Sequence, residues 1–129
     1  MTERLLVPAG TMWGDRVGYS RAVRAGQWVS VSGTTAAADA GGAVGEDDTA
    51  AQTREAPRRI AVALEQVGAG VQDVVRTRIF VTDIGRWEQV GRAHAEVFAA
   101  TRPATAMVEV SGLIDPALLV EIEADAVMP

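Results

Sequence analysis

The sequence predicts an α+β fold in which a mixed β-sheet carries two helices packed on one face. Two periodicities support this prediction. Residues 73–83 and the C-terminal runs 104–111 and 119–127 alternate in side-chain character with a period of two, which is typical of strands. Residues 49–67 and 87–98 instead carry apolar side chains at helical spacing. With shorter strands near the N-terminus, the predicted order is β-ββ-α-β-α-ββ.

The N-terminal third supplies the remaining strands. Residues 3–7 are predicted to form a short first strand, and residues 19–34 have the pattern of a hairpin that turns at 25–27. Trp13 lies in the loop between them and serves either as a lid or as a cover for the sheet edge. Residues 36–47 are rich in Ala, Gly and Asp and are predicted to be a loop.

The first helix contains a proline. Residues 49–67 have one apolar face, and Gly68 is a stop signal, but Pro57 stands inside this segment. A proline within a helix removes one backbone hydrogen bond and costs about 3 kcal/mol. We therefore expect that the helix kinks at Pro57 or that its regular part begins near Ala56.

The C-terminal alternation divides the side chains between the two faces of the sheet. The runs 104–111 and 119–127, separated by turn residues, form the pattern of a strand pair. We expect the helices to cover its apolar face, which bears Ala104, Ala106, Val108 and Val110 in the first run and Val120, Ile122, Ala124 and Ala126 in the second. The face without cover is then predicted to bear Arg76, Arg78, Glu109, Glu121 and Glu123. Water or another subunit must meet these charges.

Length and composition exclude several classes of function. The 129 residues suit a single domain spanning 1–129, and no apolar run approaches the ~20 residues of a membrane span. Because the N-terminus lacks the apolar core of a signal peptide, we expect a cytoplasmic protein that does not bind membranes. The net charge of −5, with scattered arginines, opposes nucleic acid as a partner.

The residue inventory also restricts the chemistry. The chain has no cysteine and no lysine, so thiolate and Schiff-base catalysis are excluded. A single histidine and no nucleotide-binding loop predict neither a metal site nor a cofactor. The serines at 30 and 32 have no histidine or acid at the spacing of a hydrolase triad.

Several short motifs together resemble one known family. They are YSRAV and VSG within residues 19–33, AQTR at 51–54, DVVRT at 73–77, VTD at 81–83, and RPA…VEV…LVEIEA after residue 101. In this order they resemble the RidA/YjgF family of small enamine/imine deaminases, over nearly the whole chain. The resemblance implies a chorismate mutase-like fold and a homotrimer whose small-molecule ligands bind in clefts between subunits.

The resemblance also implies roles for individual residues. It implies that Glu121 positions the water that attacks an imine carbon, that Tyr19 lies near the cleft mouth, and that Gly33 lets a ligand approach the backbone. Thr105 departs from the family, whose deaminases carry an arginine there to hold the substrate carboxylate as a bidentate pair. Met107 stands where a cysteine is common.

The second helix departs from the family too, because Gly91 and His94 stand where the family often has Asn and Tyr. The chain is thus similar to a divergent subgroup that lacks the substrate-binding arginine. It is expected to be a hydrolytic enzyme acting on a substrate without the α-carboxylate, or a trimeric metabolite-binding protein that catalyses nothing. Endoribonuclease activity, a third possibility, is opposed by the negative charge.

The residues themselves leave alternatives open. Glu121 is a general base if burial raises its pKa, or else an arginine-paired carboxylate. His94 is a ligand-binding residue or a hydrogen-bonded core histidine. Gly33 marks a ligand approach or a simple bulge. Arg78 takes over the missing positive charge, or it pairs with Glu109 or Glu123.

Overall fold

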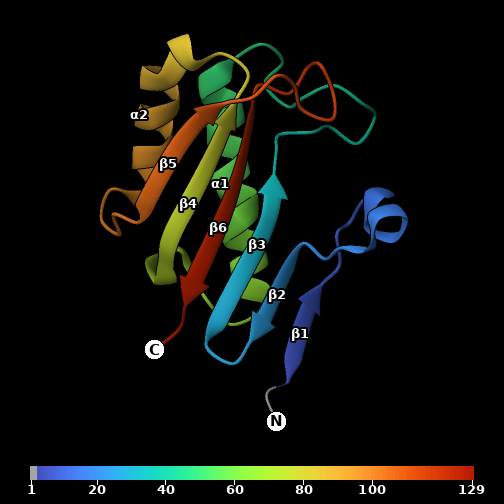
Figure 1. The fold of residues 1–129 in the computed structure, drawn as a ribbon, viewed down its shortest axis with the longest axis vertical. Helices are drawn as coiled ribbons and strands as arrows, with labels where there is room; N and C mark the ends of the chain where they lie inside the picture. Colours follow the sequence, from blue (N-terminus) through green and yellow to red (C-terminus); the bar gives the residue numbers. More distant parts are fainter. Residues whose placement is uncertain (1–2) are drawn as a thin grey trace.

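The computed structural model describes residues 3–129 and shows a mixed six-stranded sheet with two long helices on one face (Figure 1). The strand order across the sheet is β1-β2-β3-β6-β4-β5, and only β4 and β5 are parallel neighbours. The strands are β1 (Arg4–Val7), β2 (Ala22–Ala25), β3 (Trp28–Thr34), β4 (Val74–Val81), β5 (Ala104–Glu109) and β6 (Val120–Val127). The predicted α+β class is confirmed.

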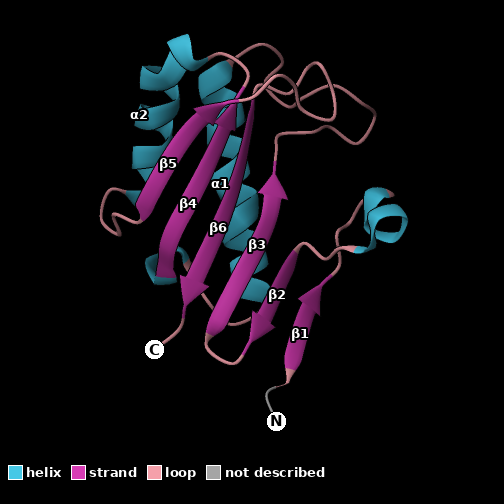
Figure 2. Ribbon diagram, viewed as in Figure 1, coloured by secondary structure: helices cyan, strands magenta, loops and turns pink. Residues whose placement is uncertain are grey.

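Two helices, α1 (Thr49–Gln66) and α2 (Trp87–Phe98), lie behind the sheet in the view of Figure 2. Three short helical turns complete the chain: η1 (Gly14–Gly18), η2 (Val71–Asp73) and η3 (Ile84–Arg86). The core lies between the sheet and the helices, where Ile79 and Ile122 of the sheet pack with Ile60, Leu64 and Phe98 of the helices. No helix within residues 3–129 combines the length and the apolar character needed to cross a membrane.

Helix α1 runs without interruption through Pro57, so the expectation that its regular part begins near Ala56 is wrong. Side chains hold its first turns in place. The Asp48 carboxylate caps the helix by accepting a hydrogen bond from the Ala51 N–H. The buried Gln52 side chain donates to two backbone carbonyls and accepts from the Leu119 N–H, which fixes the helix start to the sheet. These bonds offset the loss at Pro57.

The two C-terminal strands both form, but the prediction that they pair with each other is wrong. Strand β4 lies between them, antiparallel to β6 and parallel to β5. The reason is the connection: α2 joins β4 to β5, and a strand–helix–strand unit places its two strands side by side and parallel. The alternation within each run shows a strand but carries no information about its neighbour.

The faces of β5 are also reversed from the prediction. Thr105 is in register with Thr77, and Met107 with Ile79, so Thr105 and Met107 point to the helix side. The small apolar side chains, including the half-exposed Val108, lie on the open face of the sheet. Glu109 does not share that face with Arg76 and Arg78. Its carboxylate accepts a hydrogen bond from the Ile84 N–H at 3.0 Å.

Candidate functional site

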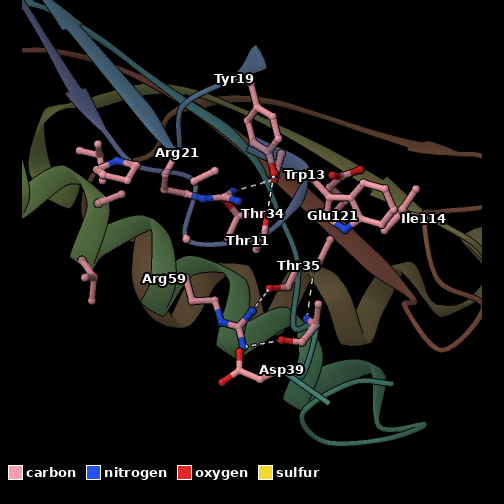
Figure 3. Close-up of a pocket in the computed structure, with 18 of the residues that line it drawn as sticks. Thr11, Trp13, Tyr19, Arg21, Thr34, Thr35, Asp39, Arg59, Ile114 and Glu121 are labelled. Atoms are coloured by element: carbon pink, nitrogen blue, oxygen red, sulfur yellow. Dashed lines mark hydrogen bonds between the residues drawn. The ribbon is translucent and has the colours of Figure 1, made fainter. Parts of the chain in front are cut away.

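A cavity of about 730 Å³ opens where the segment before β2 meets the end of β3 and the outer side of α1. Its wall includes the loop around Trp13, the stretch from Gly33 to Asp39, and the side chains of Arg58 and Arg59 from α1. Glu121 reaches it from β6 (Figure 3). The volume is in the range of sites that take small molecules.

Glu121 lies on the open face of β6, beside Gly33 of β3. A Cβ atom at Gly33 would stand 2.8 Å from the Glu121 Cδ atom, so only glycine leaves room for the carboxylate in this position. The β3–β6 register shifts between Val31 and Thr34, so the strand pairing is irregular here as well. Gly33 thus combines the irregular backbone with the close approach of a functional side chain.

The carboxyl group of Glu121 is half-buried, and its environment favours the protonated form. Desolvation raises its pKa above the usual 4.5, the nearby Glu123 raises it further, and the Arg21 guanidinium acts in the opposite direction. Among residues 3–129, the Glu121 carboxylate accepts no hydrogen bond from another protein group. A carboxylate in this state is suited to exchange a proton with a water or ligand.

Arg21 places a positive charge in the same cavity. One of its terminal nitrogens donates to the Gly33 carbonyl at 2.9 Å and to the Thr34 hydroxyl at 3.2 Å (Figure 3). The guanidinium lies 5.8 Å from the centre of the Tyr19 ring, within cation–π range. Arg21 therefore holds the backbone at Gly33 while its charge opposes the rise in the pKa of Glu121.

Aromatic and aliphatic side chains also line the cavity. Tyr19 lies next to Arg21, and its hydroxyl is 3.4 Å from that of Thr11. Met12, Trp13 and Ile114 border the opening and remain substantially exposed. Trp13 lies on the Glu121 side of the cavity in Figure 3 and is one of its lining residues.

Arg59 holds the loop that forms the far wall. Its two terminal nitrogens donate to the carbonyls of Thr35 and Ala37 at 2.8 and 2.9 Å, and its Nε donates to Glu55 at 2.7 Å. Hydrogen bonds from Arg58 and then Arg59, working against partial burial, lower the pKa of Glu55 to about 2. This cluster ties the loop at Thr35 and Ala37 to α1 on the helix side of the cavity.

A second polar cluster lies at the other edge of the sheet. The Thr77 hydroxyl is 2.9 Å from Nε2 of His94 and 2.8 Å from the Thr105 hydroxyl. Burial lowers the pKa of His94, whose ring also packs at 4.6 Å from that of Phe98. Met107, on the same side of β5, packs against the core. Thr105 and His94 are therefore brought together, but within one chain they stand apart from Glu121.

Within one chain Arg78 pairs with carboxylates, and its substitution for the missing arginine stays a prediction. Its guanidinium donates to Asp125 at 3.1 Å and lies 3.6 Å from Glu123, on the open face of the sheet. Thr105 points to the opposite face, because it is in register with the buried Thr77. The alternative, a pair between Arg78 and Glu123, is present, with Asp125 as an additional partner.

The seven predicted site residues thus fall into three places. Tyr19, Gly33 and Glu121 meet in the cavity, His94, Thr105 and Met107 lie along the β5 edge, and Arg78 belongs to neither group. Sequence reasoning missed Arg21 and Arg59. Arg21 had a signal, since it lies two residues from Tyr19 within the YSRAV motif, whereas Arg59 reads as an ordinary solvent-facing helix residue.

The arrangement contains no obvious metal centre. Over residues 3–129, no three His, Cys, Asp or Glu side chains converge as metal ligands do. The polar groups that line the cavity include the carboxylates of Asp39 and Glu121, hydroxyls and guanidinium groups. Such a set is suited to hydrogen bonding and proton transfer with a small organic ligand.

Comparison with known proteins agrees with this architecture. The family model described as endoribonuclease L-PSP matches residues 14–128. A crystal structure of a YjgF family member from Mycobacterium tuberculosis is 56% identical, with a TM-score of 0.89, over 98% of this chain and 100% of that chain. An uncharacterised protein of Streptomyces coelicolor is 38% identical over 93% of this chain and 89% of its own length.

A further relative has a named activity. The 3-aminoacrylate deaminase RutC of Acinetobacter baylyi is 33% identical over 122 residues, which cover 95% of both chains. The family model and these relatives each span most of the chain, and the motifs predicted from the sequence fall within the matched region. The chain therefore belongs to the endoribonuclease L-PSP family, which is the RidA/YjgF family that its motifs resemble.

Proposed function

We propose that the protein hydrolyses the C=N bond of small imines or enamines, with Glu121 as the general base. The observation that carries this proposal is the state of Glu121: half-buried beside Gly33, raised in pKa, and open to a cavity of about 730 Å³. The similarity to a 3-aminoacrylate deaminase supports the same class of reaction.

A single carboxylate, that of Glu121, can carry the proton transfers of this reaction. An enamine first takes a proton at carbon to give the iminium form. Ionised Glu121 accepts a proton from water as the water oxygen bonds to the iminium carbon. Protonated Glu121 then passes this proton to the nitrogen, and the C–N bond breaks with its electron pair going to nitrogen. The ammonia released takes up the hydroxyl proton, so that a carbonyl compound and ammonium leave.

The proposed substrate lacks the α-carboxylate of amino-acid-derived imines. Thr105 presents a neutral hydroxyl at the position where the family's deaminases carry an arginine. A guanidinium holds a carboxylate through two charge-assisted hydrogen bonds of about 1.5–3 kcal/mol each, whereas a threonine hydroxyl offers a single donor and no opposing charge. Met12, Trp13 and Ile114 add apolar contact surface at the border of the cavity.

We further propose that the chain is a homotrimer and that its site is completed between subunits. The open face of the sheet is not covered by either long helix, and it carries the exposed Trp28 and Val108 together with the Arg78 pairs. Packing this face against neighbouring copies would bring the Thr105 edge of one subunit toward the Glu121 cavity of the next.

A stopped-flow assay tests the proposed reaction. The imine of pyruvamide is preformed in concentrated ammonia and then diluted, and its hydrolysis is followed with and without enzyme. The wild-type protein should accelerate hydrolysis, and Glu121→Gln should abolish most of the acceleration while it preserves the fold. Binding of pyruvamide without any acceleration would instead show the non-catalytic metabolite-binding protein.

A further inference from the structure

The cavity that contains Glu121 reaches both sides of the sheet. Along β6, Glu121 alternates with the buried Ile122, so its carboxylate lies on the face opposite to the helices. The same cavity is lined by Val62 and Gln66 of α1, and α1 packs on the face that bears Ile122. The cavity therefore extends around the end of the sheet, from Glu121 to the outer side of α1.

The passage lies where the pairing of β1 with β2 ends. The last residue pair in this ladder is Val7 with Ala22, and one further bond joins the Arg21 N–H to the Val7 carbonyl at 2.7 Å. Residues 8–13 then leave the sheet and line the cavity. Because β1 ends at Val7, the cavity passes from one face of the sheet to the other beyond this end.

The part of the cavity on the helix side, which we call the helix-side lobe, is lined by Val7, Pro8, Val62, Ala63 and Gln66. Val62 and Gln66 are one helical turn apart and therefore lie on the same face of α1. Val62 is aliphatic and yet 45% exposed, whereas Val7 and Ala63 are buried. The lobe thus combines aliphatic side chains with one neutral amide, that of Gln66.

The charged groups next to the lobe are already paired. Arg58 precedes Val62 by one turn, and its Nε and Nη2 atoms donate to the Glu55 carboxylate at 2.8 and 2.6 Å. Arg59 also donates to Glu55, and its two terminal nitrogens donate to backbone carbonyls of the loop after β3. Because both guanidinium groups are engaged in this way, the lobe favours an uncharged chain over a charged one.

The cavity is larger than a small imine needs. Sites of about 300–1,000 Å³ hold drug-sized ligands, and this one measures about 730 Å³. One water molecule takes up about 30 Å³ of the liquid. The imine of pyruvamide has the bulk of only a few water molecules, so it leaves most of the cavity unfilled.

We propose that the helix-side lobe binds an uncharged alkyl tail of the substrate, while the carbon of the C=N bond lies at Glu121. This inference rests on the proposed function, which places the reacting carbon there. The substrate class is then an imine or enamine that carries an uncharged aliphatic chain of several carbons. The proposed homotrimer packs the open face of the sheet, which leaves the helix side free to receive this chain.

The binding of three carbonyl compounds tests the tail site without catalysis. Isothermal titration calorimetry compares pyruvamide with 2-oxooctanamide and N-pentylpyruvamide, which carry the same added alkyl tail at opposite ends of the molecule. Full burial of one methylene group increases affinity roughly fourfold. For a partly exposed lobe we therefore expect at least one of the tailed amides to bind about tenfold more tightly than pyruvamide, or tighter still.

Val62→Asp places a charge in the lobe, so the affinity ratio of the tailed amide to pyruvamide should fall close to one. Val44→Asp is the matched control, because Val44 is 46% exposed, lies in a loop and does not line the cavity. This control should keep the wild-type ratio. Gln66→Leu extends the aliphatic surface by one turn of α1 and should increase the ratio, which adds a test that does not depend on a loss of binding.

Equal affinity for the three amides, binding of none of them, or the same ratio in Val62→Asp as in Val44→Asp would overturn this inference, even if the wild-type enzyme hydrolysed the pyruvamide imine. An affinity that depends on the tail, in a protein that hydrolyses no imine, would instead contradict the proposed reaction and leave the binding site for the alkyl tail in place.

Discussion

The side chain of Glu121 occupies the space that a side chain at Gly33 would need, since a Cβ atom there would lie 2.8 Å from the Glu121 Cδ atom. The two residues come from neighbouring strands that are far apart in the sequence. Gly33 does not adopt the left-handed conformation that requires glycine, so the constraint comes from the neighbouring carboxylate and not from the backbone.

We predict that Gly33→Ala reduces imine hydrolysis at least tenfold, because the new methyl group displaces the Glu121 carboxylate from its position. The fold should remain, since the Glu121 side chain is able to swing away. Gly91→Ala is the matched control: a Cβ atom there meets nothing within 4 Å, and alanine favours the helix. Full activity in Gly33→Ala would show that the position of Glu121 does not matter.

The rate should depend on the ionisation of Glu121. Because burial raises the pKa of this carboxyl above 4.5, the active ionised form appears only as the pH rises through the raised value. Arg21→Gln removes the positive charge that opposes this shift, so the rising limb of the pH–rate profile should move to higher pH. Arg92→Gln, on the exposed side of α2, should leave the profile unchanged.

The Glu55 cluster should make stability sensitive to acid. The pKa of Glu55 is about 2 in the folded protein, below the ordinary 4.5, so its contribution is present above pH 4.5 and is lost as the pH falls toward 2. We expect Glu55→Gln to lower the free energy of unfolding by roughly 1 kcal/mol at neutral pH, since water screens much of the interaction. Denaturant unfolding at several pH values should show this difference shrinking in acid.

Glu88→Gln provides the comparison. Glu88 and Arg92 form an exposed pair at 3.5 Å, for which no more than a few tenths of a kcal/mol is expected. If Glu55→Gln and Glu88→Gln lower the free energy of unfolding by the same amount, the Glu55 cluster does not contribute more to stability than an exposed ion pair.

Sedimentation equilibrium at micromolar concentration should give a species of three times the 13.5 kDa chain mass. Ala106→Arg should dissociate it, because the new charge lies in register with Arg78 on the open face. Val44→Arg, in an exposed loop, is the control. A wild-type protein that remains monomeric would remove the proposed role of this face.

The helices and most strand positions were predictable because hydrophobic periodicity reports which residues are buried. The place of β5 was not, because alternating small residues such as Ala104 and Ala106 look the same on a covered face and on an open one. The pairing of β4 with β5 depends on the crossover through α2, and a single strand's pattern does not contain it.

The site was predictable only in part, because some of its contacts join segments that are far apart in the sequence. Glu121 and Gly33 are marked by the family motifs, but Arg21 acquires its role from the fold, which places its guanidinium against the Gly33 carbonyl. The Thr77–His94 bond likewise joins a strand and a helix whose contact appears only in three dimensions. Arg78 lies on the predicted face of the sheet, whereas Thr105 lies on the face opposite to the predicted one.

The proposed preference for an uncharged substrate is tested most directly with two imines that differ in the charge of one group. The imines of pyruvamide and of pyruvate are each diluted from ammonia into wild-type enzyme, and kcat/KM for hydrolysis is measured by stopped flow. We expect a higher kcat/KM for the uncharged pyruvamide imine, and the reverse order in Thr105→Arg. A wild-type enzyme that hydrolyses the pyruvate imine tenfold more efficiently than the amide would contradict it.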